Sequence, residues 1–138
     1  MSISLKTYSG SCLCATVKFT LQCEFSGFYL CHCRYCQKDT GSAHAANLFA
    51  QSAQLTWLAG EDAVNHFVLP GTRHSKSFCR HCGSALPFVQ HSPAVTVVPA
   101  GCLDDELCLR PTAHIFTDSK AGWDTELALV PAFGHLPE

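Results

Sequence analysis

The segment CHCRYC, residues 31–36, places three cysteines within six positions of the chain. Three thiols this close in sequence form either a disulfide-linked knot or most of a metal site. The N-terminus has no long apolar run typical of a signal peptide, so we expect a cytoplasmic protein. In a reducing compartment, grouped cysteines bind metal more often than they form disulfides. The segment therefore predicts a metal site.

Composition favours one folded domain spanning residues 1–138. Hydrophobic residues make up 47% of the chain and charged residues 14%, which is enough apolar material for a core. The formal net charge is −2, and the nine basic residues are dispersed. Because a nucleic-acid-binding surface needs clustered basic residues, we expect no nucleic-acid partner. No run of residues has the length and hydrophobicity of a membrane span. The composition does not indicate an oligomeric state.

The local pattern of the sequence is that of a mainly β protein. In residues 16–21, the apolar residues Val17, Phe19 and Leu21 alternate with polar ones, as expected for a half-buried strand. Only RYCQKDTG suggests a short helix, ended by Gly41. Further β-rich runs, several of them followed by glycine turn signals, occupy residues 27–33, 54–60, 65–71, 94–101 and 113–119. We expect a single compact domain of antiparallel sheets, with cysteines at strand ends and turns.

Seven of the ten cysteines fall into three groups, which are Cys12 with Cys14, Cys31 with Cys33 and Cys36, and Cys79 with Cys82. Zinc prefers four ligands in a tetrahedron, and a Cys-x-x-Cys pair followed by glycine is typical of a zinc knuckle because glycine allows a sharp turn. A Cys-x-Cys pair in a strand directs both thiols to the same face. Seven ligands cannot make two closed sites of four, so one site has three protein ligands or some cysteines bind no metal.

The spacing permits two ways of grouping these cysteines. A zinc-ribbon arrangement combines Cys33 and Cys36 with the pair Cys79 and Cys82. The other arrangement combines Cys79 and Cys82 with the N-terminal Cys-x-Cys pair and keeps the cysteines of CHCRYC together. Local spacing favours the second arrangement, because one metal can bind all three clustered thiols without a ligand from a distant strand.

Five segments in order, GSCLCATVKF, CHCRYCQKDTGS, FCRHCGSAL, PAGCLDD and HIFTDSKAGWD, resemble the glutathione-dependent formaldehyde-activating enzyme family. The resemblance extends from about Gly10 to about Trp123. It implies a mostly β fold with two zinc sites, and an enzyme that condenses formaldehyde with glutathione, a carbon–sulfur lyase in the reverse sense. Ala15 stands where the family usually has glycine. By position, the resemblance implies a structural zinc site at Cys12, Cys14, Cys79 and Cys82, and a catalytic zinc site at Cys31, Cys33 and Cys36.

A zinc ion held by three cysteines has chemistry of its own. Three thiolates leave the ion with a net charge of −1, which weakens it as a Lewis acid toward a carbonyl. The ion can instead bind a fourth thiol and keep it as a nucleophilic thiolate near neutral pH. We therefore expect a thiol such as glutathione and a small electrophile such as formaldehyde as substrates, and a second zinc that is labile because it lacks one protein ligand.

Glutathione carries two carboxylates, so its site should present cations. Arg34 and Lys38 are four residues apart next to the cysteine cluster, on one face if this segment is helical. Lys120 and Trp123 lie in the last resembling segment and are further candidates for binding glutathione. The alternative for these residues is an ordinary solvated surface or, for Trp123, a place in the core or at its rim.

Other cysteines and histidines have simpler interpretations. His32 alternates with Cys31 and Cys33, so in an extended backbone it points away from them, either to the surface or behind the metal ligands. The isolated cysteines are interpreted as small buried hydrophobic residues; they are Cys23, Cys102 and Cys108. Two other functions remain open, a non-catalytic zinc-stabilised β domain that binds a protein partner, and a redox or metal-buffering protein.

Overall fold

Alternating burial along the second strand shows how the sequence specifies a β fold. The computed structural model describes residues 5–137. In strand β2 (Lys18–Cys23), Phe19 is 1% exposed, and Leu21 and Cys23 are fully buried, whereas Lys18 and Gln22 face outward. This is the period of two expected for a strand with one face on the core. The mainly β prediction is confirmed, with shifts of up to three residues at strand ends, and the run predicted at 113–119 is a strand only over Ala113–Ile115.

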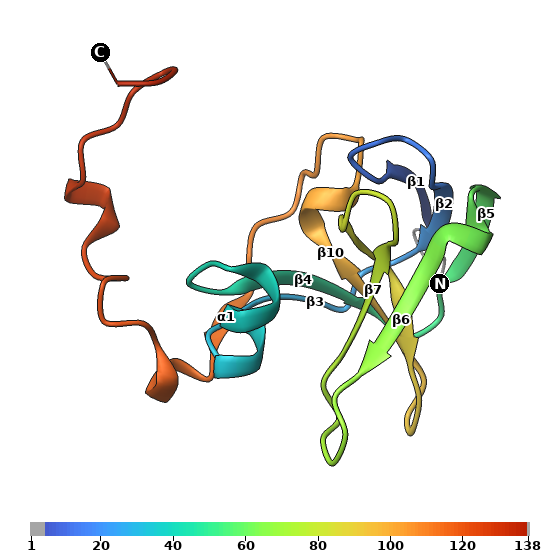
Figure 1. Cartoon of the computed structure of the whole chain (residues 1–138), viewed down its shortest axis with the longest axis horizontal. Helices are drawn as coiled ribbons and strands as arrows, with labels where there is room; N and C mark the ends of the chain where they lie inside the picture. Colours follow the sequence, from blue (N-terminus) through green and yellow to red (C-terminus); the bar gives the residue numbers. More distant parts are fainter. Residues whose placement is uncertain (1–4, 138) are drawn as a thin grey trace.

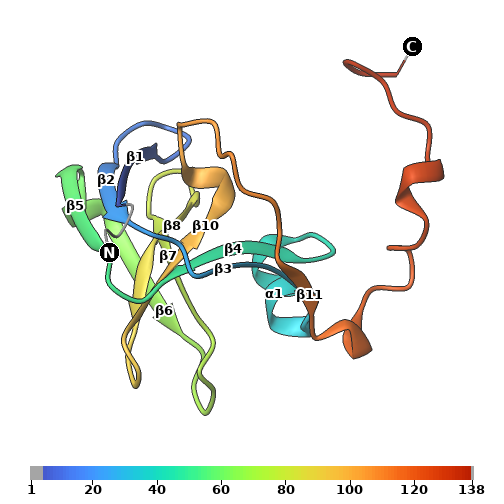
Figure 2. The ribbon, with the colours of Figure 1, turned by 180° about the vertical axis from the view of Figure 1, so that it is seen from behind.

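Eleven strands among the described residues form three sheets. Most of them are labelled in Figures 1 and 2. One sheet has the order β1–β2–β5, with bounds Lys6–Ser11, Lys18–Cys23 and Gln54–Ala59. The second has the order β11–β3–β4–β10–β9, with bounds Ala113–Ile115, Gly27–Cys31, Ala45–Ala50, Val95–Pro99 and Phe88–Gln90. The third has the order β6–β7–β8, with bounds Val64–Val68, Ser75–Cys79 and Ala85–Leu86. The pairing is antiparallel except between β11 and β3, which run parallel.

Helix α1 (Arg34–Thr40) follows β3 directly, in the segment where the sequence predicts a short helix. Its N-cap is Cys33, whose thiol accepts a hydrogen bond from the backbone N–H of Cys36. Its last turn ends at Gly41, which has a φ of 66°. Glycine reaches this left-handed conformation without the strain that a side chain brings, which explains why the helix ends there. Four single turns of 3-10 helix complete the described elements: η1 (Glu61–Ala63), η2 (Ala100–Cys102), η3 (Thr117–Ser119) and η4 (Leu127–Leu129).

The core takes side chains from all three sheets. Its fully buried members include Leu21 of β2, Leu48 of β4, Leu86 of β8 and Val98 of β10. A second, smaller cluster contains Cys31 at the end of β3, Cys36 in the first turn of α1 and Ala45 at the start of β4. The cysteine cluster therefore sits at the edge of the main core, where a strand passes into a helix.

The C-terminal end of the chain, from η4 onward, extends away from the body of the protein, as Figures 1 and 2 show from opposite sides. It carries exposed apolar side chains, among them Leu129, 76% exposed, and Phe133, 60% exposed. No helix within residues 5–137 has the length and apolar character needed to cross a membrane.

Candidate metal centres

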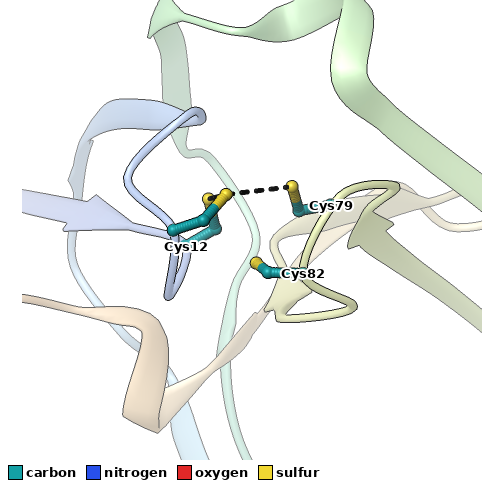
Figure 3. Close-up of side chains that lie close together, drawn as sticks. Cys12, Cys79 and Cys82 are labelled. Atoms are coloured by element: carbon teal, nitrogen blue, oxygen red, sulfur yellow. Dashed lines mark hydrogen bonds between the residues drawn. The ribbon is translucent and has the colours of Figure 1, made fainter.

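Four cysteines from two segments that are more than 60 residues apart in sequence lie close together in the structure. Cys12 and Cys14 follow β1, and Cys79 and Cys82 frame the turn between β7 and β8. Their sulfur atoms all lie within 4.8 Å of one another. Figure 3 shows Cys12 facing Cys79 and Cys82 across a short gap. This is the second of the two groupings that the spacing permits, and it excludes the zinc-ribbon combination of Cys33 and Cys36 with Cys79 and Cys82 in this structure.

The distances in this four-cysteine group match a tetrahedral zinc site. With a zinc–sulfur bond of about 2.3 Å, two ligand sulfurs of a tetrahedron lie about 3.8 Å apart. The Sγ atom of Cys14 lies 3.7 Å from that of Cys12 and 3.9 Å from that of Cys79. Backbone N–H groups also donate to the sulfurs, from Val17 to Cys12 at 3.2 Å and from His81 to Cys79 at 3.4 Å. Four free thiols arranged in this way could hold one zinc ion.

The turns that present these thiols differ in one respect from the sequence-based expectation. Cys12 and Cys14 lie in a turn after β1, closed by a hydrogen bond from the N–H of Ala15 to the carbonyl of Cys12, and not in a strand. The turn, rather than strand alternation, brings the two thiols together. In the other turn Gly83 has a φ of 75°, as expected for a knuckle. A backbone hydrogen bond from Cys14 is the main reason that the pKa of Cys82 falls to about 6.

The cysteine trio, Cys31, Cys33 and Cys36, forms a separate group whose sulfur atoms also lie within 4.8 Å of one another. Cys31 ends β3, Cys33 caps α1 and Cys36 lies in its first turn. No fourth cysteine, histidine or carboxylate of residues 5–137 joins them within that distance. All ten cysteines, which fall within the described residues, are free thiols, so the trio is not a disulfide knot.

The three thiols of the trio differ in the direction of their pKa shifts, because their surroundings differ. Burial opposes ionisation of Cys33, but hydrogen bonds from the N–H groups of Cys36 and Tyr35 outweigh it and lower the pKa of Cys33. Burial raises the pKa of Cys31, and burial together with the neighbouring thiols raises the pKa of Cys36 further still. Three adjacent thiolates would repel one another strongly in this place. A bound cation removes that repulsion, so the donor set fits a metal such as zinc, held by three protein ligands.

The trio lies in the wall of a cavity of about 570 Å³ between α1, β3, β4 and the β6–β7 hairpin. This volume is within the range of small-molecule sites. Arg73, His74 and Lys76 also line the cavity, together with aromatic side chains such as Tyr29 and Phe88. Lys76 is partly neutralised, because its Nζ lies 3.8 Å from Oδ1 of Asp39. Among residues 5–137, Arg73 forms no ion pair within 4.0 Å, so its charge is free for an anionic ligand.

None of the four residues predicted to bind glutathione lines this cavity. Lys38 lines a neighbouring groove with Phe67 and Phe78, next to the cavity rather than within it. Arg34, Lys120 and Trp123 are exposed, Trp123 by 65%, and they are not among the residues that line the cavity. Their role in binding remains a prediction.

Sequence reasoning missed Arg73 and Lys76. They lie in and next to β7, about 40 positions from the trio, and only the folding of the β6–β7 hairpin against α1 brings them to the cavity. A hydrogen bond of 2.7 Å from Lys76 Nζ to the carbonyl of Asp39 in α1 fixes this approach. No local spacing could have revealed it.

Comparison with known proteins decides the family. The sequence profile of the family described as "glutathione-dependent formaldehyde-activating enzyme" matches residues 7–119. The chain belongs to this family. As a member of the formaldehyde-activating enzyme family, it has both cysteine groups and the cavity inside the matched residues, whereas Trp123 lies beyond them. The family resemblance inferred from the five motifs is confirmed.

The fold is also similar to that of a solved structure. The crystal structure of a Rhodobacter sphaeroides protein superimposes with a TM-score of 0.54 at 18% sequence identity, covering 77% of this chain and 98% of that one. At this identity the likeness concerns the fold alone. No curated protein sequence matches the chain.

Proposed function

We propose that this member of the formaldehyde-activating enzyme family binds a thiol such as glutathione in the 570 Å³ cavity and adds it to a small aldehyde such as formaldehyde. The observation that carries the proposal is that one cavity is lined both by the cysteine trio and by Arg73, which forms no ion pair within residues 5–137. The reaction forms one carbon–sulfur bond, and the thiol proton is transferred to the carbonyl oxygen. Run in reverse it is a carbon–sulfur lyase reaction.

The two cysteine groups have different roles in this proposal. Cys12, Cys14, Cys79 and Cys82 hold a structural zinc that ties the turn after β1 to the β7–β8 turn. The trio holds a second zinc, which, when bound, keeps a substrate thiol in its thiolate form. Having three protein ligands, this second zinc is the more easily lost. The protein surroundings supply the rest, by orienting the substrate and keeping water away from the reacting atoms.

In this proposal, the cationic side chains that line the cavity recognise the substrate. Glutathione carries two carboxylates, and a guanidinium binds a carboxylate through two parallel hydrogen bonds. Arg73 is the best placed residue for this, because Lys76 already interacts with Asp39. Apolar and aromatic side chains along the remaining walls, including Tyr29, Phe88 and Ile115, would exclude water around the thiol.

The test is a glutathione titration of cobalt-substituted protein, followed by the sulfur-to-cobalt charge-transfer absorption. A saturable gain is expected, because the substrate thiol adds a fourth sulfur to the cobalt held by the trio. Arg73→Ala should weaken binding about 10-fold or more, since it removes a charge-assisted hydrogen bond. Arg34→Ala is the matched comparison, because it removes the same side chain outside the cavity lining.

Three results would change the proposal. An unchanged spectrum with both cysteine groups loaded would favour the non-catalytic zinc-stabilised domain, with its partner still to be found. A loss in Arg34→Ala as large as in Arg73→Ala would place the carboxylate-binding residues on the exposed side of α1. Binding of glutathione without turnover of formaldehyde would direct the search to other aldehydes.

A further inference from the structure

Three side chains outside both cysteine groups point their donor atoms at one place. They are His32 in the link from β3 to α1, His44 just before β4, and Asp124 in the C-terminal segment. One donor atom of each lies within 4.8 Å of the others. His32 is 1% exposed and Asp124 is 8% exposed, so most of this group is shielded from water. We call it the His-Asp cluster.

The orientation of His32 is fixed from its other side. Its Nε2 atom lies 2.8 Å from Nδ1 of His114, in hydrogen-bonding distance. Its carbonyl oxygen accepts hydrogen bonds from the side chains of Gln37, at 2.8 Å, and Ser119, at 3.0 Å. These contacts hold the imidazole so that Nδ1 faces Asp124, with 3.4 Å between Nδ1 and Oδ2. The sequence prediction that His32 points away from the trio agrees with this arrangement, but the side chain is buried and not on the surface.

The buried nitrogens of the cluster are unsatisfied. The Nδ1 atoms of His32 and His44 are both inaccessible to water and have no hydrogen-bond partner within residues 5–137. When His32 donates from Nε2 to His114, its Nδ1 carries a lone pair that faces the Asp124 carboxylate. A buried polar atom without a partner costs about 1–3 kcal/mol, and a lone pair facing a carboxylate adds repulsion. A small cation between these atoms would remove both costs.

We propose that His32, His44 and Asp124 form a third metal site, which takes a first-row divalent cation such as Zn²⁺. Two imidazoles and one carboxylate form a donor set typical of zinc, cobalt and ferrous iron in proteins. Ligand atoms about 2.0–2.1 Å from a tetrahedral ion are about 3.4 Å apart. The Nδ1–Oδ2 distance of 3.4 Å between His32 and Asp124 already has this value. The His114 ring lies where its Nδ1 can accept the Nε2–H of His32, an arrangement that would leave the Nδ1 lone pair of His32 for the ion.

This site lies outside the thiol chemistry proposed above and has a structural consequence. Asp124 is the last buried residue among the described residues, and every residue of the segment that follows it, 125–137, is exposed. A metal bound to Asp124, His32 and His44 would hold the start of this segment against the β3–α1 link. Because His32 lies between Cys31 and Cys33 in sequence, the same ion would also stiffen the backbone that carries the trio.

The experiment uses the full chain with both cysteine groups loaded with zinc, to which cobalt is then added. Wild-type protein should bind one further equivalent, giving ligand-field absorption without a sulfur-to-cobalt charge-transfer band. His44→Ala and Asp124→Asn should bind this equivalent at least about 100-fold more weakly, since loss of a direct ligand exceeds the 10–100-fold effect of removing an outer partner. His91→Ala and Asp118→Asn, which change exposed residues of the same types, should bind it as wild type does.

Imidazole nitrogen shifts provide a second measurement that does not depend on absorption. Zinc in excess of the cysteine sites should move the Nδ1 resonances of His32 and His44 in the wild type and leave His91 unchanged. Near-ultraviolet circular dichroism shows whether each variant is folded, and Asp124→Asn preserves the shape of the side chain. Equal cobalt binding by wild type and both variants, no third equivalent in the wild type, or uptake accompanied only by a charge-transfer band would each overturn the proposal.

Discussion

At the scale of single residues, the three isolated cysteines occupy two kinds of environment. Cys23 is fully buried in β2, and Cys102 is 7% exposed in η2. Burial raises the pKa of Cys23 to about 11 and that of Cys102 to about 12, so both remain neutral thiols. Their interpretation as buried hydrophobic residues is right. For Cys108 it is wrong, because this residue lies on an irregular segment between η2 and β11, where its thiol is exposed.

This difference predicts which thiol reacts first in the zinc-loaded protein. Alkylation at pH 8 should modify Cys108 rapidly, whereas Cys23 and Cys102 should react more than about 100-fold more slowly, because the reactive thiolate is scarce at a raised pKa and burial limits access. Peptide mapping by mass spectrometry after timed quenching measures the three rates. Cys108→Ser should abolish the fast phase. Rapid labelling of Cys23 or Cys102 in the folded protein would contradict the burial described here.

Residue types and spacing predicted which cysteines lie together, but not which cationic side chains line the cavity. Cysteines in the trio are neighbours along the chain, so a local pattern was enough to group them. Arg73 comes to the cavity through the pairing of β6 with β7, and its position in sequence carries no sign of this. The His-Asp cluster was missed for the same reason, because His44 and Asp124 are 80 positions apart.

At the scale of elements, the turn after β1 carries measurable strain. Ala15, which stands where the family usually has glycine, adopts a φ of 65°. The left-handed conformation costs a residue with a side chain about 1–2 kcal/mol. Glycine would avoid this cost but lose about 0.5–1 kcal/mol through its greater freedom in the unfolded chain. Ala15→Gly should therefore stabilise the zinc-loaded protein by about 0.5–1 kcal/mol, measured by urea unfolding.

The matched control for this variant is Gly41→Ala at the end of α1. Gly41 has a φ of 66°, and an added Cβ would meet no atom within 4 Å, so only the backbone conformation changes its energy. Gly41→Ala places a side chain in the left-handed conformation, so it should lower the free energy of unfolding by about 0.5–1 kcal/mol. If both variants shifted stability in the same direction, backbone conformation could not be the cause.

Elements with a clear pattern were predicted and those without one were not. β2 alternates apolar and polar residues, β10 is rich in β-branched residues, and α1 is followed by a glycine that ends it. Each was therefore predicted close to its observed bounds. Five strands were missed: β1, β4, β7, β8 and β9. β4 reads AANLFA and β7 reads SKSFC, and their small and polar residues carry little β signal of their own. Pairing with stronger neighbours makes them strands, which is a property of the sheet and not of the segment.

At the scale of the whole molecule, the folding of the three sheets brings the four-cysteine group and the cavity-lining residues together. The four-cysteine group joins the turn after β1 to the β7–β8 turn, and the cavity lies between the β3–α1 link and the β6–β7 hairpin. Both sites therefore depend on contacts between segments at least 30 residues apart in sequence. The fold class followed from local periodicity, whereas the positions of these contacts required the three-dimensional pairing of strands.

The C-terminal segment contributes little to this body, which leads to a prediction about its removal. Five apolar side chains after Asp124 are 49–86% exposed: Leu127, Leu129, Val130, Phe133 and Leu136. Because they bury little surface, a chain that ends at Thr125 should keep its melting temperature within about 2 °C of the full chain. Such a chain keeps both cysteine groups and all three residues of the His-Asp cluster, so its metal content should not change.

A core variant sets the scale for this comparison. Leu48 is fully buried in β4, and Leu48→Ala should cost about 2–5 kcal/mol, equivalent to at least about 6 °C in the melting temperature of a chain of this size. Calorimetry on the two variants, both loaded with zinc, distinguishes an appendage from a packed part of the fold. If ending the chain at Thr125 lowered the melting temperature as far as Leu48→Ala does, the apolar side chains after Asp124 would have to pack against the body in solution, and the extended path of this segment would be wrong.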